Sequence, residues 1–425
     1  MKTPLYTALQ QHRALHRAPF HTPGHKCAPG ALPPDLLALD YTELPDTDSL
    51  FEASGPILQA EQAAAALFGA KRTLFSAGGC SLCIQTMLRL ACPQGGTVLC
   101  ARNAHRTAAN AMALLGLTPM WAMPQEMLSI LRYNTNSINA CYVTSPDYYG
   151  RILDIPALSE ACHRRGIPLL VDNAHGTHLA FTKPDLHPLH QGASMTADSA
   201  HKTLNVLTGG AWLQIGEERY VDAAKAAMSL FASTSPSYPI MASLDLARAF
   251  LQENPHAFAP VQRSVQALSQ AAMSRGIPNV SDDPARLALC TAEIGISGTA
   301  AAQIFRANGV EPEMADAAYV VLIATPWNTA EDFVRAEKAV NALPLAEPLP
   351  RLPDLPDLPP VRLPLREAVF APSHTVLLQD AVGHVAAEAA CPCPPGIPVV
   401  MPGEEVTAQA VQFLRRYGFL SLRVL

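Results

Sequence analysis

Short apolar runs alternate with helix-forming stretches in the first half of the chain. Residues 57–68 have a helix-forming composition and end at Gly69, which predicts a helix with a glycine C-cap. Three short apolar runs predict strands: residues 97–100, 140–144 and 167–171. Helical stretches such as 156–165 separate them, and this alternation predicts an α/β fold with a buried parallel sheet. Because ligands bind such sheets at the carboxyl ends of the strands, we expect the chemistry just after each strand.

A second pattern of strands and helices begins near Arg286. LALCTAEIG and AAYVVLIAT predict strands, while SGTAAAQIFRANG and TAEDFVRAEKAVNAL predict helices, which together indicate a smaller α+β domain. The following stretch is rich in proline, which disfavours both helix and central strand, and predicts an extended connector. We therefore expect five parts: an N-terminal arm (1–50), a large α/β domain (51–280), a small α+β domain (281–342), a proline-rich connector (343–364) and a C-terminal segment (365–425).

Composition narrows the function classes. The 425 residues are 49% hydrophobic and 16% charged, which indicates a folded protein of two or three domains. The formal net charge of −6 offers no field for a nucleic acid backbone. No apolar stretch reaches the length of a membrane-spanning helix, and the N-terminus is polar where a secretory signal would be apolar, so we expect a cytoplasmic protein.

The ten cysteines are scattered along the chain, and no second pair stands at zinc spacing. A disulfide framework is not expected in a cytoplasmic chain of this length. Cys80 and Cys83 form a CxxC motif that could be a redox pair, but they open an apolar run after two glycines. That position favours a loop that enters a helix.

The most informative motif is DSAHKTL at 198–204. Lys202 stands between a histidine and small hydroxyl residues, with apolar residues soon after, so burial could lower its pKa and free the amine for Schiff-base chemistry. A surface lysine is the alternative. Asp172 ends a predicted strand 30 residues earlier, a distance that allows one crossover and brings both residues to the same crevice. A buried carboxylate there suits a cation such as the protonated ring nitrogen of pyridoxal phosphate, although an N-cap or loop carboxylate remains an alternative.

Together these motifs resemble the Orn/Lys/Arg decarboxylase family of pyridoxal-phosphate enzymes, which have the aspartate-aminotransferase fold. Further family-like segments follow in order along nearly the whole chain: FHTPGHK (20–26), TELP (42–45), FGA (68–70), RNAHR (102–106), TSPDYYG (144–150), PPGIP (394–398) and PGE (402–404). The resemblance implies a fold-type-I enzyme with a large, mainly parallel sheet domain and a smaller C-terminal α+β domain. The length is similar to that of the compact family members, which lack a receiver-like N-terminal domain.

The resemblance also implies residue roles. Lys202 matches the lysine that forms the internal aldimine, Asp172 the carboxylate that keeps the ring nitrogen protonated, and His105 the histidine that stacks on the cofactor. His201 and Ser199 match residues that contact the cofactor or its phosphate, and Ala174 and His175 complete the expected cofactor-binding set. Without the family context, His105 would be taken for a loop or capping histidine.

The expected phosphate-binding turn is SAGGCS at 76–81, where Gly79, Cys80 and Ser81 would open a helix toward the anion. Family members usually have hydroxyl residues after the first glycine, whereas this chain has Gly79 and Cys80 and regains a hydroxyl at Ser81. Two further departures are Asn173, where an acidic residue is usual, and Cys393, where an aromatic residue is common.

The implied reaction is decarboxylation of a basic amino acid through an external aldimine and a quinonoid, with His201, Lys202 or a partner-subunit residue returning the proton to Cα. A distal carboxylate must bind the substrate side chain, and Asp46, Asp48 and Glu404 are candidates, each also readable as an ordinary surface or capping acid. By analogy with short family members, arginine is favoured over lysine or ornithine, which would place the enzyme in polyamine biosynthesis. The family also implies a homodimer or a higher even-numbered oligomer.

Three alternatives remain open. The altered phosphate turn is compatible with a catalytically silent protein that binds the cofactor. Another fold-type-I reaction, such as amino transfer, would use the same residues. A metal-dependent hydrolase could use His21, His25, His175, His178, His201 and Asp172, but it would leave Lys202 without a role, and we expect no metal.

Overall fold

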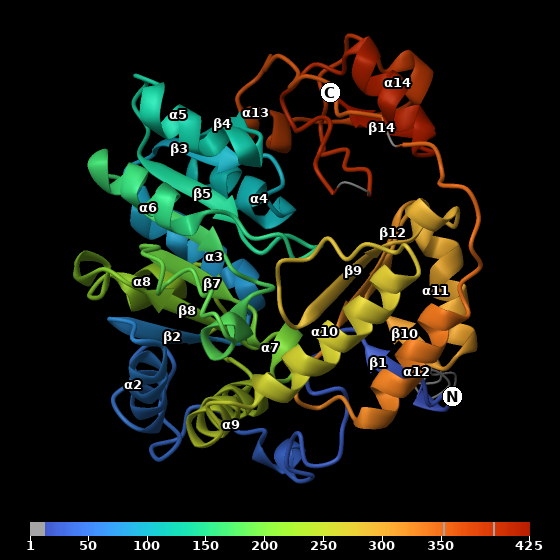
Figure 1. Cartoon of the computed structure of the whole chain (residues 1–425). Helices are drawn as coiled ribbons and strands as arrows, with labels where there is room; N and C mark the ends of the chain where they lie inside the picture. The colour runs from blue at the N-terminus through green and yellow to red at the C-terminus, as the bar shows by residue number, and fades with distance from the viewer. Residues whose placement is uncertain (1–12, 352, 394–395) are drawn as a thin grey trace, which may run out of the picture.

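The computed structural model describes residues 13–351, 353–393 and 396–425. Residues 1–12 of the predicted arm, Leu352 of the connector, and Pro394 and Pro395 of the PPGIP motif lie outside the described residues. Figure 1 shows a large sheet with its helices, a smaller sheet with its own helices, and a C-terminal segment, in orange and red, that lies near helix α4 (Arg106–Leu115) of the large sheet.

Seven strands form the large sheet in the order β2-β8-β7-β6-β5-β3-β4. Their bounds are β2 (Arg72–Ser76), β3 (Gly96–Ala101), β4 (Leu117–Ala122), β5 (Ala140–Thr144), β6 (Leu169–Asp172), β7 (Met195–Asp198) and β8 (Ala211–Ile215). β7, β6, β5, β3 and β4 are parallel, whereas β8 is antiparallel to both of its neighbours. The predicted mainly parallel sheet is confirmed.

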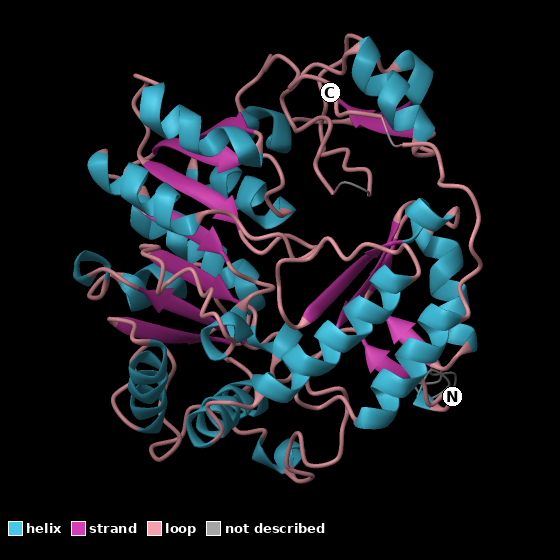
Figure 2. Ribbon diagram, in the orientation of Figure 1, coloured by secondary structure: helices cyan, strands magenta, loops and turns pink. Residues whose placement is uncertain are grey.

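Helices cover both faces of this sheet (Figure 2). In β3, Val98 and Cys100 pack in one apolar cluster, and Leu99 and Ala101 pack in another on the opposite face. The first cluster includes α3 (Gly79–Ala91), α4 (Arg106–Leu115) and α8 (Ala224–Ser229); the second includes α5 (Met127–Tyr133) and α6 (Ile155–Arg164). Burial on both faces explains why the strands are apolar along their whole length.

The predicted helix at 57–68 is also present. α2 (Pro56–Phe68) ends at Gly69, whose φ of 61° is left-handed and whose N–H caps the last turn. α2 packs against β2 and against α9 (Tyr238–Glu253) at the edge of the large sheet.

The smaller sheet has the antiparallel order β11-β12-β9, formed by β9 (Arg286–Cys290), β11 (Met314–Ala315) and β12 (Tyr319–Ile323). Three helices surround it: α10 (Phe258–Ser274), α11 (Gly298–Ala307) and α12 (Ala330–Asn341). β1 (Ala18–Phe20) pairs in parallel with β10 (Val310–Pro312), so the N-terminal arm joins this smaller part of the molecule. The α+β pattern predicted from Arg286 onward is therefore present.

The C-terminal segment has its own apolar cluster, to which α14 (Ala408–Arg416) and β14 (Ser421–Val424) contribute. β14 pairs with β13 (His374–Leu377), and α13 (Leu365–Phe370) packs on α4. The described part of the 343–364 connector contains no helix or named strand, as its prolines predict. Whether the five predicted parts are independent domains stays a prediction. Among the described residues, no helix combines the length and apolar character that crossing a membrane requires.

Candidate active site

The carboxyl ends of the parallel strands bring the predicted site residues together. β6 ends at Asp172, and β7 leads through Ser199 into α7 (Ala200–Thr203), which carries Lys202. The Nζ atom of Lys202 lies 2.9 Å from Nε2 of His175. Burial lowers the pKa of the Lys202 amine, which makes the neutral, nucleophilic form more accessible.

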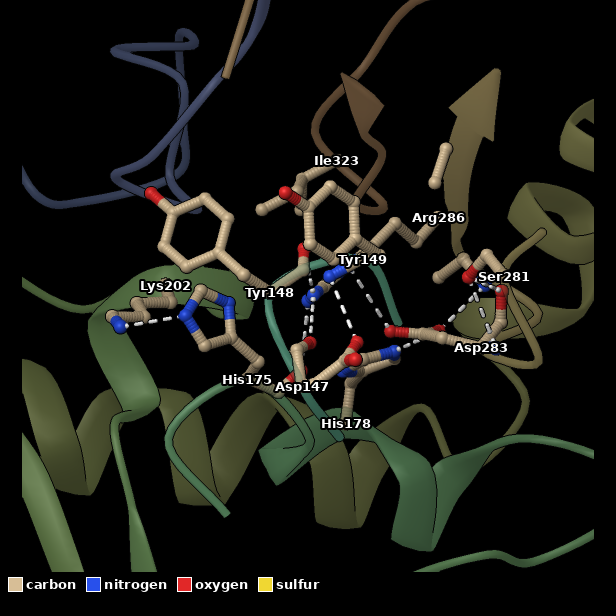
Figure 3. Close-up of polar contacts among 12 residues, drawn as sticks. Asp147, Tyr148, Tyr149, His175, His178, Lys202, Ser281, Asp283, Arg286 and Ile323 are labelled. Carbon is tan, nitrogen blue, oxygen red and sulfur yellow. Dashed lines mark hydrogen bonds and ion pairs between the residues drawn. The ribbon is translucent and has the colours of Figure 1, made fainter. Parts of the chain in front are cut away.

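His175 is the immediate partner of that amine. Burial lowers the pKa of its imidazole well below the usual value, and the charges of Lys202 and Arg286 act in the same direction. A neutral ring accepts a hydrogen bond from Lys202 at Nε2, while the buried Nδ1 has no hydrogen-bond partner among the described residues. The ring of Tyr148 packs edge-on against His175 with centroids 4.8 Å apart (Figure 3).

Asp172 is only 2% exposed. Burial raises the pKa of its carboxyl, whereas the charges of Lys202 and His105 oppose that shift. One oxygen accepts from the hydroxyl of Tyr142 at 3.1 Å and the other from the N–H of Ala174 at 3.2 Å. The carboxylate is thus oriented and retains the capacity to accept from a cationic N–H.

His105 is the N-cap of α4, as its alternative interpretation expects. Its Nδ1 accepts from the backbone N–H of Thr107 at 3.3 Å and lies 2.9 Å from the Thr107 hydroxyl. Burial lowers the pKa of His105, and the charges of Asp172 and Lys202 also act on it, in opposite directions. The histidine therefore lies within electrostatic reach of both site residues, and its stacking role stays a prediction.

The expected phosphate turn opens α3. Gly79 has a φ of 68°, and its N–H donates to Gly209 O at 2.8 Å, so that donor is already used. The N–H groups of Cys80 and Ser81 remain in the first helical turn, which favours an anion. Burial raises the pKa of the Cys80 thiol well above its usual value, so Cys80 is neutral there.

Hydroxyl groups lie on either side of this turn. Ser81 Oγ lies 3.2 Å from Thr107 Oγ1. Ser199 Oγ lies 3.2 Å from Nδ1 of His201, a nitrogen that is also 3.1 Å from Gly210 O. Burial lowers the pKa of His201, so its ring is predominantly neutral near pH 7.

The FHTPGHK segment contacts the Lys202 turn of its own chain. The N–H of Gly24 donates to His201 O at 2.6 Å, and Gly24 O accepts from the Thr325 hydroxyl at 2.9 Å. A Cβ at Gly24 would lie 2.5 Å from the backbone N and O of Leu204, so only glycine permits this approach. The sequence left open whether this segment serves its own site or that of a partner.

The three predicted substrate carboxylates differ in placement. Asp48 accepts from the backbone N–H groups of Ser49, Ser54, Gly55 and Ile57 at the start of α2. Glu404 is buried and binds Arg102 through both oxygens at 2.6 Å each. These two have structural partners, whereas Asp46 is exposed, and a role in substrate binding stays a prediction for all three.

Glu313 was missed because it falls between two predicted elements and belongs to no motif. It follows β10, and its carboxylate accepts from Thr22 N at 2.6 Å and from the Tyr148 hydroxyl at 3.0 Å. Its negative charge raises the pKa of both Lys202 and His201, so it lies near the candidate site. No local signal in the sequence distinguishes it from a surface acid.

The histidines that a metal-dependent hydrolase would need have separate contacts. His178 binds Asp283 at 2.8 Å, and His175 contacts Lys202. Within residues 13–351, 353–393 and 396–425, no group of three or more His, Cys, Asp or Glu side chains is arranged to hold a metal ion.

The same region fits pyridoxal phosphate. Lys202 offers an amine, Asp172 a buried carboxylate for the ring nitrogen, and the start of α3 backbone donors for the phosphate. The buried Nδ1 of His175, which has no partner among the described residues, is a further polar group able to contact a ligand.

Family models and known proteins match this chain along most of its length. The family described as Orn/Lys/Arg decarboxylase, major domain, matches residues 3–132 and 129–274, and its C-terminal domain matches residues 365–420. An uncharacterised Bacillus subtilis protein, YaaO, is 30% identical over 98% of this chain and 94% of its own length. Arginine decarboxylase of B. subtilis is 29% identical over 97% of this chain and 93% of its own length.

The constitutive lysine decarboxylase of Escherichia coli is 27% identical over 52% of this chain and 34% of its own length. Its solved structure superposes with a TM-score of 0.75 at 19% identity, covering 92% of this chain and 73% of the other. This likeness confirms the predicted fold-type-I architecture. The matches across both family regions show that the chain belongs to the Orn/Lys/Arg decarboxylase family and is an amino-acid decarboxylase.

Proposed function

We propose that this chain is a pyridoxal-phosphate-dependent decarboxylase that converts arginine to its amine and CO₂. The observation that carries the proposal is the half-buried amine of Lys202, held beside His175 and within the electrostatic reach of Asp172. This cofactor requires two groups: a lysine amine with a lowered pKa and a buried carboxylate.

Each residue has a defined task in this proposal. Lys202 binds the cofactor covalently through its neutral amine, and Asp172 accepts the ring N–H and favours its cationic form. When bound, pyridoxal phosphate supplies a ring that accepts the electron pair left by departing CO₂. Burial of Asp172 and His175 excludes water from this side of the site. His201 or Lys202 returns the proton to Cα.

Arginine is favoured among the basic amino acids for two reasons. The relative named arginine decarboxylase matches nearly the whole chain, whereas the relative named lysine decarboxylase matches about half of it. Glu313 also supplies a carboxylate near Lys202, and each of its oxygens, besides the hydrogen bond that it accepts from Thr22 or Tyr148, can accept one more from a guanidinium. We assign the recognition of the distal cation to Glu313.

The experiment is to add pyridoxal phosphate to the purified protein, record its visible spectrum, and assay amine and CO₂ from arginine, lysine and ornithine. Lys202→Ala abolishes both the cofactor band and product formation, while Lys183→Ala, at an exposed lysine, retains both. A cofactor band without any amine product would favour a silent cofactor-binding protein, and a keto acid product would indicate amino transfer.

Glu313→Gln tests the substrate assignment. We expect KM for arginine to rise at least tenfold with a smaller effect on kcat, because a charged pair to the distal group is lost. Glu160→Gln, at an exposed acid of α6 that pairs with Arg164, is the control and leaves KM unchanged. An unchanged KM in Glu313→Gln would overturn this role.

We propose a cytoplasmic homodimer, or a higher even-numbered oligomer, whose product enters polyamine biosynthesis. Size-exclusion chromatography with light scattering measures the oligomer directly, and a monomer that retains full activity would contradict the expected oligomer.

A further inference from the structure

A single guanidinium connects two loops of the candidate site. Arg286, at the start of β9, is fully buried. One terminal nitrogen donates to Asp147 O at 3.1 Å and to Tyr148 O at 3.2 Å, in the loop after β5. The other donates to His175 O at 3.1 Å, in the loop after β6. The first strand of the smaller sheet thus holds the main chain of both loops.

The guanidinium also has a counter-charge. Its Nε forms an ion pair with Asp283 Oδ2 at 3.5 Å, without a hydrogen bond, and Asp283 Oδ1 lies 2.8 Å from His178 Nε2. Gly150 adds a steric contact, because a Cβ at this position would lie 3.0 Å from Arg286 Cδ. Figure 3 shows these side chains converging from the two loops and from the start of β9. The arrangement leaves the guanidinium little freedom to reorient.

The held loops determine where the His175 ring lies. The carbonyl of His175 is bound by Arg286, and its ring packs against Tyr148, whose own carbonyl is bound by the same guanidinium. The Nε2 atom of the ring meets the Lys202 amine. We propose that Arg286 is a positioning residue that fixes the His175 imidazole as the hydrogen-bond acceptor of Lys202.

This inference rests on the proposed function only in taking Lys202 as the reacting amine. Besides its hydrogen bonds, Arg286 contributes a positive charge that lowers the pKa of Lys202, an effect that the negative charges of Asp172 and Glu313 oppose. A test must therefore separate the positive charge of Arg286 from the hydrogen bonds that its guanidinium donates. Arg286→Lys keeps the charge and loses the guanidinium's set of N–H donors.

The experiment is a double-mutant cycle with Arg286→Lys, His175→Phe and the double variant. The full chain, prepared without cofactor, is trace-labelled with acetic anhydride between pH 6 and 10, and acetylation of Lys202 is quantified by mass spectrometry. In holoenzyme, kcat and KM for arginine are measured in parallel. Arg165→Lys is the matched control, because Arg165 also binds three main-chain carbonyls, those of Leu131, Asn134 and Asn136.

We expect each single variant to lower the pH midpoint of Lys202 labelling, because the ammonium loses its acceptor. Each also lowers kcat about tenfold to hundredfold with little change in KM, as expected for a misplaced site group. The double variant has the same labelling midpoint and the same kcat as His175→Phe, because Arg286 acts through His175. Arg165→Lys changes neither the midpoint nor kcat.

Additive effects in the double variant, or an unchanged labelling midpoint in Arg286→Lys, would overturn the proposal. Where Arg286→Lys does not fold, Asp283→Asn loosens the guanidinium without removing it and must shift the midpoint in the same direction. If the wild-type chain releases no amine from any of the three amino acids but the labelling cycle still shows coupling, the proposed function fails and the positioning role stands.

Discussion

Asn173 and Asp198 form a buried amide–carboxylate contact between the ends of β6 and β7. Asn173 Nδ2 donates to Asp198 Oδ1 at 2.6 Å, and His187 Nε2 lies 3.1 Å from Asp198 Oδ2. The resemblance led us to expect an acidic residue at position 173. In this chain an acid there would face a second buried carboxylate, so the amide is the residue that Asp198 requires. The departure from the family pattern has a local structural reason.

Exchanging the two groups tests this explanation. Asn173→Asp alone should lower the free energy of unfolding by about 3 kcal/mol, because it places two carboxylates in contact in a buried site. Asn173→Asp with Asp198→Asn restores one acid and one amide and should recover most of that loss. Urea unfolding of the wild type, Asn173→Asp and the double variant measures the free energy of unfolding. A double variant as unstable as Asn173→Asp would refute the explanation.

Lys26 carries a buried amine on the FHTPGHK segment. Its Nζ donates to His21 O at 2.6 Å and to Ile323 O at 3.0 Å. Burial lowers its pKa to about 7. An unfolded lysine titrates near pH 10.4, so between about pH 7 and 10 the unfolded chain binds a proton that the folded chain does not. The stability contribution of Lys26 therefore increases as the pH rises through this window.

Lys26→Met removes this titration. We expect the unfolding free energy of the wild type, relative to Lys26→Met, to increase between about pH 7 and pH 10 and to be constant below pH 6. Denaturant unfolding at several pH values measures the difference. A difference that does not change with pH would show that the amine titrates alike in both states.

At the scale of elements, Gly24 lets the N-terminal segment lie against α7. Gly24→Ala places a methyl group against the backbone of Leu204, which cannot yield without moving the turn that carries Lys202. We expect the free energy of unfolding to fall by about 1–3 kcal/mol. We also expect kcat to fall by a larger fraction than the free energy of unfolding, because the turn that carries Lys202 moves. Thermal melts and steady-state kinetics measure both.

Gly418→Ala is the control for this prediction. Unlike Gly24, Gly418 has a left-handed φ of 78°, and nothing lies within 4 Å of an added methyl group. It should cost stability through backbone strain and leave kcat unchanged. If Gly24→Ala behaves like this control, the contact with the Lys202 turn has no catalytic consequence.

Sequence patterns predicted the elements whose signal is local. The apolar runs that became β3, β5 and β6 are buried on both faces and therefore stand out. The pairing of β1 with β10 was not predictable, because three residues carry no periodicity and their partner lies far along the chain. The same holds for the site: Lys202, Asp172 and His105 lie in motifs after strands, whereas Glu313 and Arg286 reach the site only through tertiary folding.

At the scale of the whole molecule, one ion pair joins the C-terminal segment to the large sheet. Arg102 follows β3, and besides both oxygens of Glu404 it binds the carbonyls of Pro398 and Val399. Both side chains are buried. The pair therefore anchors the C-terminal segment close to the loop that carries His105.

Glu404→Gln leaves the Arg102 charge buried without its counter-charge. We expect the unfolding free energy to fall by about 3–5 kcal/mol while KM of the folded enzyme stays within a factor of two. Guanidinium unfolding and steady-state kinetics distinguish this outcome from the sequence-based hypothesis. If Glu404 binds the substrate side chain, KM rises sharply and stability changes little.

The hydrogen bond from Gly24 to His201 O makes one amide a natural reporter. Its proton exchanges with solvent deuterium only when the FHTPGHK segment separates from the turn that carries Lys202. Exchange at this amide thus measures how often the turn that carries Lys202 opens, without any substitution or label at the turn itself. A ligand that closes the site should slow exchange there, twenty residues or so from the start of the chain, before any change is seen in the helices of the large sheet.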